Sequence, residues 1–357
     1  MADAAPPADP GHPHPGRPDP TPPDDRLSVF RAPVVLVVLL AAAAALFAGS
    51  YCVAMANPTP HRLPVAVVGS SPRGPQLVDE LEKRLDSALQ VHVYPDDASA
   101  GQAVDEQRVF AVLRLRERSA VLGLVPAAGA STARVLAVAG PPAGQAAGLP
   151  VAVTDIRPLQ STDPQGLAVF YISLAAVIIG FVGAVQLSVH ARALDPPERI
   201  AFTAAYAVLG GFAVAATVDW GLGVLDLPFA ESWGILTLTM CTTGMVFTMF
   251  NTLIGRWAIL PTWGLMVLLG NPSSGGAVSW PLLPQPLGLI GRWLPPGASV
   301  NAQHTAIYFR QDQYAFPYLV LLGWLALSTA VFWLWQDRHP GGRSAAAAAT
   351  GTAPAGT

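Results

Sequence analysis

The chain has 357 residues, of which 52% are hydrophobic and only 12% are charged, whereas a typical soluble protein has roughly 25% charged residues. So few charges cannot cover a water-facing surface, and the mean hydropathy of +0.43 indicates a membrane protein whose partner is the lipid bilayer. The net charge of −3 excludes a strongly basic nucleic-acid binder, because neutralising phosphates requires clustered Lys and Arg.

The N-terminal part of the chain is expected to be a tail followed by a membrane helix. Residues 1–24 are rich in proline and show no apolar periodicity, so they are predicted to be a disordered cytoplasmic tail. Arg26–Arg31 has apolar residues between two arginines, a pattern that predicts a short interfacial helix. Pro33–Met55 is long and apolar enough to cross the hydrocarbon core. Residues 25–55 therefore hold the predicted interfacial helix and the first predicted transmembrane helix.

Residues 56–165 are the region whose pattern is typical of a water-soluble domain. Short apolar or alternating runs predict strands, and charged segments with regularly spaced apolar residues predict helices. Val109–Leu115 and Ala120–Val125 are expected to pair as a hairpin around Glu117 and Arg118. The other expected elements are the strands Leu63–Gly69, Val91–Tyr94 and Pro150–Leu159 and the helices Gln76–Leu89, Ala98–Glu106 and Ser131–Val138. Strands alternating with helices predict an α/β domain on one sheet.

Four more apolar runs without a charged residue predict further membrane helices. They are Gly166–Val189, Ile200–Val218, Ser232–Ile254 and Pro317–Trp335. Another run, Trp257–Gly270, is well short of the roughly 20 residues that a spanning helix needs, so it must be tilted, extended or supported by its neighbours. The predicted fold class is a polytopic α-helical membrane protein with six transmembrane helices, with the α/β domain inserted between helices 1 and 2. The membrane domain is predicted over residues 166–336, and residues 337–357 are predicted to be a disordered cytoplasmic tail.

A Pro-rich apolar stretch precedes the last membrane helix. Val278–Leu294 contains Pro281, Pro284 and Pro286, and prolines at this spacing argue against one continuous helix. Non-helical backbone at membrane depth is tolerated only where protein shields it or water reaches it. The region near residues 271–302 is therefore predicted to be a re-entrant or interfacial element on the outer side.

The distribution of arginines predicts the orientation, because cytoplasmic loops carry an excess of Lys and Arg. With the N-terminus inside, the cytoplasmic segments would hold Arg17, Arg26, Arg31, Arg192, Arg199, Arg256, Arg338 and Arg343. The short outer segments would hold only Arg292 and Arg310. Both termini are therefore predicted to be cytoplasmic and residues 56–165 extracytoplasmic, in a multi-pass protein of the cell membrane.

The sequence offers no motif for catalysis, nucleotide binding or metal binding. The phosphate-loop pattern GxxxxGK[ST] is absent, and Lys83, the only lysine, falls within a predicted helix. Cys52 and Cys241 lie in apolar runs without the spacing of a zinc site. We therefore expect no enzyme activity on this chain, and no cofactor, metal or catalytic residue.

The layout of one membrane helix, an external α/β domain and five further membrane helices resembles that of the type-two ABC exporter permeases, in particular their YhgE/Pip (phage infection protein) branch. The sequence DPQG at residues 163–166, followed by an apolar run, is similar to the entry into that family's second span. Residues 270–302, GNPSSGGAVSWPLLPQPLGLIGRWLPPGASVNA, look like its signature of a small-residue turn, a Pro-flanked half-helix and an LPPG exit. The loop at residues 192–200 lies where such permeases carry the helix that contacts their ATPase.

Two candidate sites follow from this resemblance. Glycines would let a re-entrant backbone turn, Ser and Asn would satisfy exposed peptide groups, and prolines would limit helix length. The candidate outer gate comprises Asn271, Ser273, Ser274, Gly275, Gly276, Pro281 and Pro284. The alternative interpretation of the candidate outer gate is a Pro-rich outer loop that covers the membrane helices and has no gating role. The candidate ATPase-coupling loop, where charges around two prolines offer a docking surface, comprises Arg192, Asp195, Glu198 and Arg199.

The resemblance implies the permease subunit of an ABC-type exporter that moves a hydrophobic or amphipathic compound out of the cell. ATP hydrolysis would be supplied by a separate ATPase subunit, because this chain has no nucleotide-binding motif. A homo- or heterodimer is expected, because six membrane helices are too few to form a symmetric pathway alone. The alternative is a non-transporting membrane receptor or scaffold whose external domain binds a partner.

Overall fold

The computed structural model describes residues 26–55, 60–191 and 193–338 of the chain. Its internal contacts divide the chain into two units, Met1–Leu46 and Phe47–Thr357. The predicted N-terminal tail lies outside the described residues, and so does nearly all of the predicted C-terminal tail. The α/β domain and the later membrane helices both belong to the second unit.

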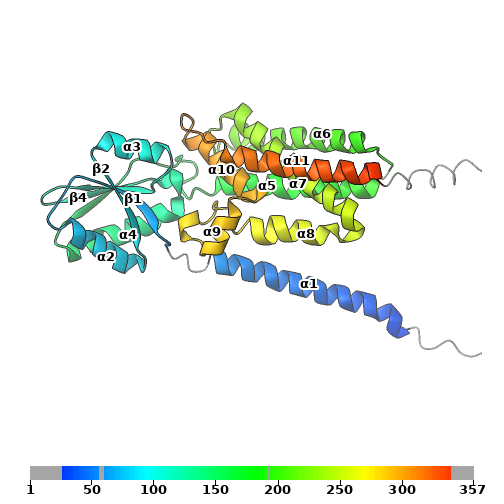
Figure 1. Ribbon diagram of the computed structural model, residues 1–357, viewed down its shortest axis with the longest axis horizontal. Coiled ribbons are helices and arrows are strands. Elements are labelled where there is room, and N and C mark those ends of the chain that lie inside the picture. The colour runs from blue at the N-terminus through cyan, green and yellow to red at the C-terminus, as the bar shows by residue number, and fades with distance from the viewer. Residues whose placement is uncertain (1–25, 56–59, 192, 339–357) are drawn as a thin grey trace, which may run out of the picture. The chain divides into compact units, whose positions relative to one another are not determined.

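Helix α1, Arg26–Met55, contains the first predicted membrane helix (Figure 1). It continues without a break through Pro33, so the predicted interfacial helix is not a separate element. The part from Pro33 onward has a mean hydropathy of 2.4 and is long enough to cross a membrane.

A five-stranded sheet forms the centre of the domain that follows α1 (Figure 1). Its strands are β1 Leu63–Val68, β2 Leu89–Tyr94, β3 Ala111–Leu115, β4 Ala120–Leu124 and β5 Val151–Asp155, in the order β2-β1-β3-β4-β5. The helical elements are α2 Gly74–Leu85, α3 Asp97–Asp105, the 3₁₀ turn η1 Pro126–Ala128 and α4 Ala130–Ala146. β3 and β4 pair antiparallel and the other neighbouring strands pair parallel. The predicted α/β domain and its hairpin are therefore confirmed.

Successive residues of β1 face two different cores, because side chains alternate along a strand. Val65 and Val67 belong to the core that the sheet forms with α2 and α4. Ala66 points to the opposite face and belongs to the core with Ala103 of α3. Phe309, from the membrane part of the chain, is 4% exposed and belongs to this second core. One face of the sheet is thus covered by α2 and α4, and the other by α3 together with Phe309 of the membrane part.

Two helices of this domain end at places that differ from the predicted ones. α2 stops before Asp86, which has the left-handed φ of 50°, and Leu89 begins β2 instead of continuing the helix. α4 runs on to Ala146 through Pro141 and Pro142. Proline weakens a helix interior, but packing of an apolar face supplies most of a helix's stability in a protein, and α4 buries such a face against the sheet.

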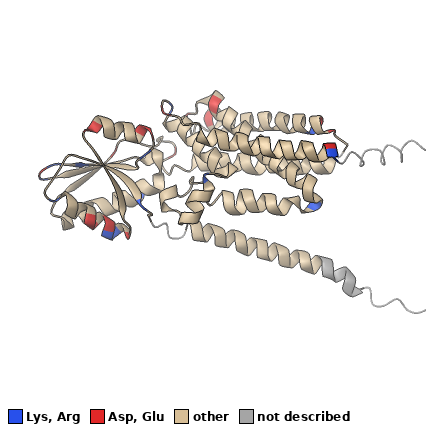
Figure 2. Ribbon diagram, viewed as in Figure 1, with Lys and Arg blue, Asp and Glu red and all other residues tan. Residues whose placement is uncertain are grey.

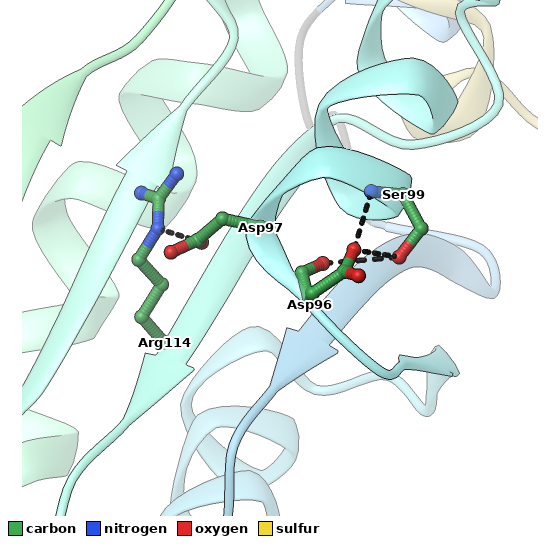
Figure 3. A network of polar contacts seen from close by, with 4 residues as sticks. All are labelled: Asp96, Asp97, Ser99 and Arg114. Carbon is green, nitrogen blue, oxygen red and sulfur yellow. Dashed lines mark hydrogen bonds and ion pairs between the residues drawn. The ribbon is translucent and has the colours of Figure 1, made fainter.

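The start of α3 is fixed by its N-cap residue, Asp96 (Figure 3). The backbone N–H of Ser99 donates a 2.8 Å hydrogen bond to the Asp96 carboxylate, and this bond lowers the pKa of Asp96. The Ser99 hydroxyl donates to the same carboxylate. Beside the cap, Arg114 of β3 pairs with Asp97 and links the start of α3 to the sheet.

The described residues that follow the domain are mostly helical (Figure 1). The longer helices are α5 Ala168–His190, α6 Pro196–Ala216, α7 Phe229–Ile254, α10 Pro295–Tyr308 and α11 Phe316–Arg338. The shorter elements are η2 Thr217–Gly221, η3 Gly255–Ala258, α8 Ile259–Trp263, η4 Gly264–Gly270, η5 Trp280–Leu282 and α9 Gln285–Gly291.

Among the described residues, five helical segments are long and apolar enough to cross a membrane. They are Pro33–Met55, Ala168–His190, Pro196–Gly221, Phe229–Gly270 and Phe316–Arg338. In the bundle, charged residues gather near the helix ends and leave the middle of the helices uncharged, whereas the α/β domain carries charges over its helices (Figure 2). This is the pattern of a multi-pass membrane protein.

The predicted sixth span, Trp257–Gly270, is not one long α-helix. It consists of η3, α8 and η4, and it follows α7 after Gly255, which has a φ of +60°. α8 contacts α7 and is drawn as a separate rod (Figure 1). By length and composition this segment counts together with α7 as one candidate of 42 residues. A sixth crossing therefore stays a proposal.

Residues 271–302 interrupt the long helices, but their C-terminal part differs from the prediction. Turns are followed by η5 and by the short helix α9. The LPPG sequence, predicted as an exit, instead starts α10, with Pro295 and Pro296 in its first turn. Proline is favoured there, because its missing N–H would have no helical partner anyway. Almost every residue of α10 is buried.

Candidate functional site

The predicted outer gate lies in residues 271–284, here named the gate segment, which join η4 to α9. Asn271, Ser273 and Ser274 are at most 2% exposed. The Ser273 hydroxyl donates to the carbonyl of Leu269 at 2.6 Å, and the Ser274 hydroxyl donates to the carbonyl of Asn271 at 2.7 Å. The two serines therefore satisfy peptide groups where the helix breaks.

The two glycines of the gate segment are required for different reasons. Gly275 has a φ of +82°, a conformation that side chains disfavour, and a Cβ there would lie 2.5 Å from the Trp280 ring. Gly276 does not have a positive φ. A Cβ on Gly276 would lie 2.9 Å from the Phe170 ring and 3.2 Å from Val300. The positive φ agrees with the predicted turn at Gly275, whereas Gly276 permits close packing of the gate segment against α5 and α10.

The gate segment is hydrogen-bonded directly to the α/β domain. The backbone N–H of Ser279 donates to the hydroxyl of Ser131 at 2.8 Å, and the two hydroxyls also lie 2.8 Å apart. The backbone N–H of His61 donates to the carbonyl of Pro281 at 2.7 Å. Pro284 is the N-cap residue of α9. The domain thus holds the middle of the gate segment at two points.

Helix α10, which lies next to the gate segment, is buried and yet polar. Ser299, Gln303 and Thr305 are fully buried. The hydroxyls of Ser299 and Thr239 are hydrogen-bonded at 2.8 Å, and the Gln303 amide donates to the carbonyl of Ser232 at 2.9 Å. Burying polar groups is costly unless they are hydrogen-bonded, and polar side chains within a membrane bundle often mark functional positions. α10 therefore joins its neighbours through buried hydrogen bonds as well as through apolar packing.

A cavity of about 270 Å³ lies where the gate segment, α10 and the α/β domain meet. Gly275 and Gly276 form part of its wall, so the predicted gate residues border this cavity. Its polar lining comprises Gln107, Arg108, Ser279, Arg292, Asn301, His304 and Tyr314. No Asp or Glu of the described residues lines it. We name this space the arginine cavity.

The charge of the arginine cavity comes from its two arginines. The guanidinium of Arg292 lies over the ring of Trp280, 4.8 Å from the ring centroid, a favourable cation–π arrangement. No carboxylate of the described residues lies within 4.0 Å of that guanidinium. Arg108 is paired with Glu106 at 2.6 Å. The cavity therefore contains one arginine whose charge is not compensated by a neighbouring carboxylate.

The other titratable groups of the cavity are neutral at pH 7. Burial lowers the pKa of His304 to about 4, although the charge of Asp163 acts in the opposite direction. Burial also raises the pKa of Tyr314, whose hydroxyl donates a 2.6 Å hydrogen bond to the side-chain oxygen of Asn301. The cavity can thus offer polar groups and a positive charge to a ligand.

The predicted coupling loop is in part the N-terminus of α6. The backbone N–H of Asp195 donates to the Glu198 carboxylate at 2.9 Å, and the two residues form a capping box that fixes the start of the helix. The guanidinium of Arg199 donates to the carbonyl of Ala191 at 3.3 Å. Arg192 lies outside the described residues. Asp195 and Glu198 are exposed at this end of the bundle, so they combine a structural role with an accessible charge.

No sequence motif pointed to Asn301, His304 or Tyr314 as site residues, and Arg292 entered only the count of arginines that predicts the orientation. The signal that would have found two of them is the pair of prolines at the start of α10. A helix that begins there has Asn301 and His304 three residues apart, on one face.

The fold and the site together are those of a membrane protein with long apolar helices, in which an α/β domain is hydrogen-bonded to a segment that interrupts the helices. Within the described residues, no group of three His, Cys, Asp or Glu could hold a metal ion. No family model, curated protein or solved structure matches this chain.

Proposed function

We propose that this chain is a permease subunit of an ABC-type exporter, which moves a hydrophobic or amphipathic compound across the membrane with ATP hydrolysis supplied by a separate subunit. The observation that carries the proposal is the gate segment, which interrupts the long helices of the bundle and which the α/β domain holds through Ser131 and His61. A bundle that served only as an anchor would have no need of such a segment, because continuous helices satisfy every backbone group more simply.

The opposite end of the bundle supports a partner in the cytoplasm. α5, α6 and α7 run in alternating directions, so the start of α6 and the ends of α7 and α11 lie away from the α/β domain (Figure 1). Arg199, Arg256 and Arg338 are at these three places. By the positive-inside rule this end faces the cytoplasm, where an ATPase could dock on Glu198. The proposal includes a sixth crossing by η3–η4, a re-entrant gate segment and a dimer.

The gate is tested by substitution at Gly276. Gly276→Ala places a methyl group against Phe170 and Val300, and overpacking of this kind typically costs 1–3 kcal/mol. We expect loss of export, measured as growth of expressing cells in deoxycholate, at normal protein abundance. The control is Gly264→Ala, because a Cβ at Gly264 meets no atom within 4 Å. Full export by the Gly276→Ala variant would contradict a gating role.

The coupling loop is tested by Glu198→Gln. Glutamine preserves the capping box, so this change removes the charge without removing the helix start that Glu198 supports. We expect a several-fold loss of the ATPase subunit that co-purifies with the detergent-solubilised protein. Asp337→Asn, at an exposed position near the same end of the bundle, is the matched control. If no ATPase co-purifies with the unaltered protein, the hypothesis of a non-transporting receptor or scaffold becomes the better one.

A further inference from the structure

An apolar groove lies close to the arginine cavity. It has a volume of about 440 Å³ and is lined along α11 by Phe316, Val320, Gly323 and Leu327. Spacings of three and four residues place these side chains on one face of the helix. At 1.5 Å per residue the groove follows α11 for about 16 Å. The lining residue Leu327 is 54% exposed in the chain, so the groove opens to the surface that would face lipid.

The cavity and the groove share two walls. Arg292 lines the cavity and the next residue, Trp293, lines the groove. On the other wall, Tyr314 lines the cavity and Phe316 lines the groove. The rings of Trp293 and Phe316 meet edge to face, with centroids 4.9 Å apart. The indole N–H of Trp324 donates to the carbonyl of Trp293 at 2.8 Å and fixes this wall.

The two hollows also lie at the depths that a lipid would require. Gly166, two residues before α5, and Tyr314, two residues before α11, both line the cavity. The cavity is therefore at the level where membrane helices begin, which is the level of lipid head groups. The groove extends from there along the apolar part of α11.

We propose that an anionic phospholipid of the surrounding bilayer binds here, with its head group in the arginine cavity against Arg292 and an acyl chain in the groove. A guanidinium binds phosphate oxygens in a bidentate manner, so Arg292 can bind the phosphate of an anionic head group. The cavity is smaller than the roughly 300–1,000 Å³ of a typical small-molecule site, so it accommodates a head group and leaves the chain to the groove. The proposal goes beyond the export function and does not depend on it.

The head-group contact is tested with the full-length protein in detergent. Binding of dioctanoyl phosphatidylglycerol and dioctanoyl phosphatidylcholine, which differ in net charge, is measured by calorimetry. We expect the anionic lipid to bind at least tenfold more tightly, and Arg292→Gln to remove this preference. Arg310→Gln, an exposed position outside the cavity, should keep the preference. Equal affinities in the unaltered protein, or an unchanged preference in Arg292→Gln, would overturn the proposal.

The groove is tested by Gly323→Leu, because a side chain at Gly323 enters open space with no atom within 4 Å of its Cβ. We expect it to weaken both dioctanoyl lipids about tenfold. Gly234→Leu changes a glycine of α7 whose Cβ would also meet no atom within 4 Å, and it should leave the affinity for both lipids unchanged. Unchanged lipid affinity in Gly323→Leu, or glycerol 1-phosphate binding as tightly as the anionic lipid, would show that no acyl chain occupies the groove. A protein that prefers the anionic lipid but exports nothing keeps this proposal and overturns the export function.

Discussion

At the residue scale, His304 shows how the tertiary structure sets the protonation state of a side chain. In the sequence it is one of seven histidines. Its ring lies 5.2 Å from the ring of Tyr308, and it borders the arginine cavity. Desolvation disfavours the charged imidazolium and lowers the pKa of His304. The charge of Asp163 acts in the opposite direction and favours the charged form. His304 is therefore a neutral wall of the cavity at physiological pH.

This environment predicts a pH dependence of stability. The pKa of His304 is about 4 in the folded protein, against 6.5 for an unperturbed histidine. Between these values the unfolded chain binds more protons, so stability falls as pH falls from about 6.5 towards 4, by up to about 1.4 kcal/mol per pH unit. Thermal unfolding in detergent at pH 7 and pH 4.5 measures the loss. His304→Gln should flatten the profile in this window, and an unchanged slope in that variant would contradict the burial of a neutral ring.

At the element scale, the junction between α10 and the sheet links the two parts of the second unit. Phe309 follows α10 directly and is buried with Ala66 and Val112 of the sheet. Gln107, after α3, also donates to the hydroxyl of Thr305 on α10 at 3.3 Å. Sequence patterns predicted neither contact, because each joins positions far apart in the chain and no local periodicity encodes them.

Removing this anchor should loosen the α/β domain. Phe309→Ala deletes a ring that is 4% exposed, and truncations of this kind typically cost 3–5 kcal/mol. We expect a lower unfolding temperature and faster hydrogen exchange in β1 and β3, the strands that Phe309 covers. Phe309→Leu retains most of the apolar contact. Its unfolding temperature and exchange rates should therefore lie between those of the unaltered protein and those of Phe309→Ala. Unaltered exchange in Phe309→Ala would show that the domain does not depend on α10.

At the scale of the whole molecule, the distribution of arginines predicts the orientation of the protein in the membrane. The arginines at the ends of α6, α7 and α11 predict that the α/β domain faces the outside. In a chain carrying Cys52→Ser and Cys241→Ser, a cysteine replacing Ser70 should react with an impermeant thiol reagent on intact cells. Ser70 is suitable because it is exposed.

The matching internal position is Ala193, which is also exposed. A cysteine replacing it should react only after the cells are permeabilised. Reaction of both cysteines in intact cells, or of the Ala193 replacement alone, would reverse the assigned orientation. That result would also contradict the proposed docking of an ATPase at Glu198.

The sequence by itself determined five long apolar helices and the α/β domain, because hydropathy and strand or helix periodicity are local properties that each segment carries along its own length. It also located the break at the gate segment, since prolines and glycines act on the backbone where they stand. Only the tertiary structure decided that Gly276 is required for packing, that the prolines at the LPPG sequence start a buried helix, and that Arg292 and His304 share one cavity. These facts depend on contacts between distant segments, and burial and charge compensation arise only when those segments meet.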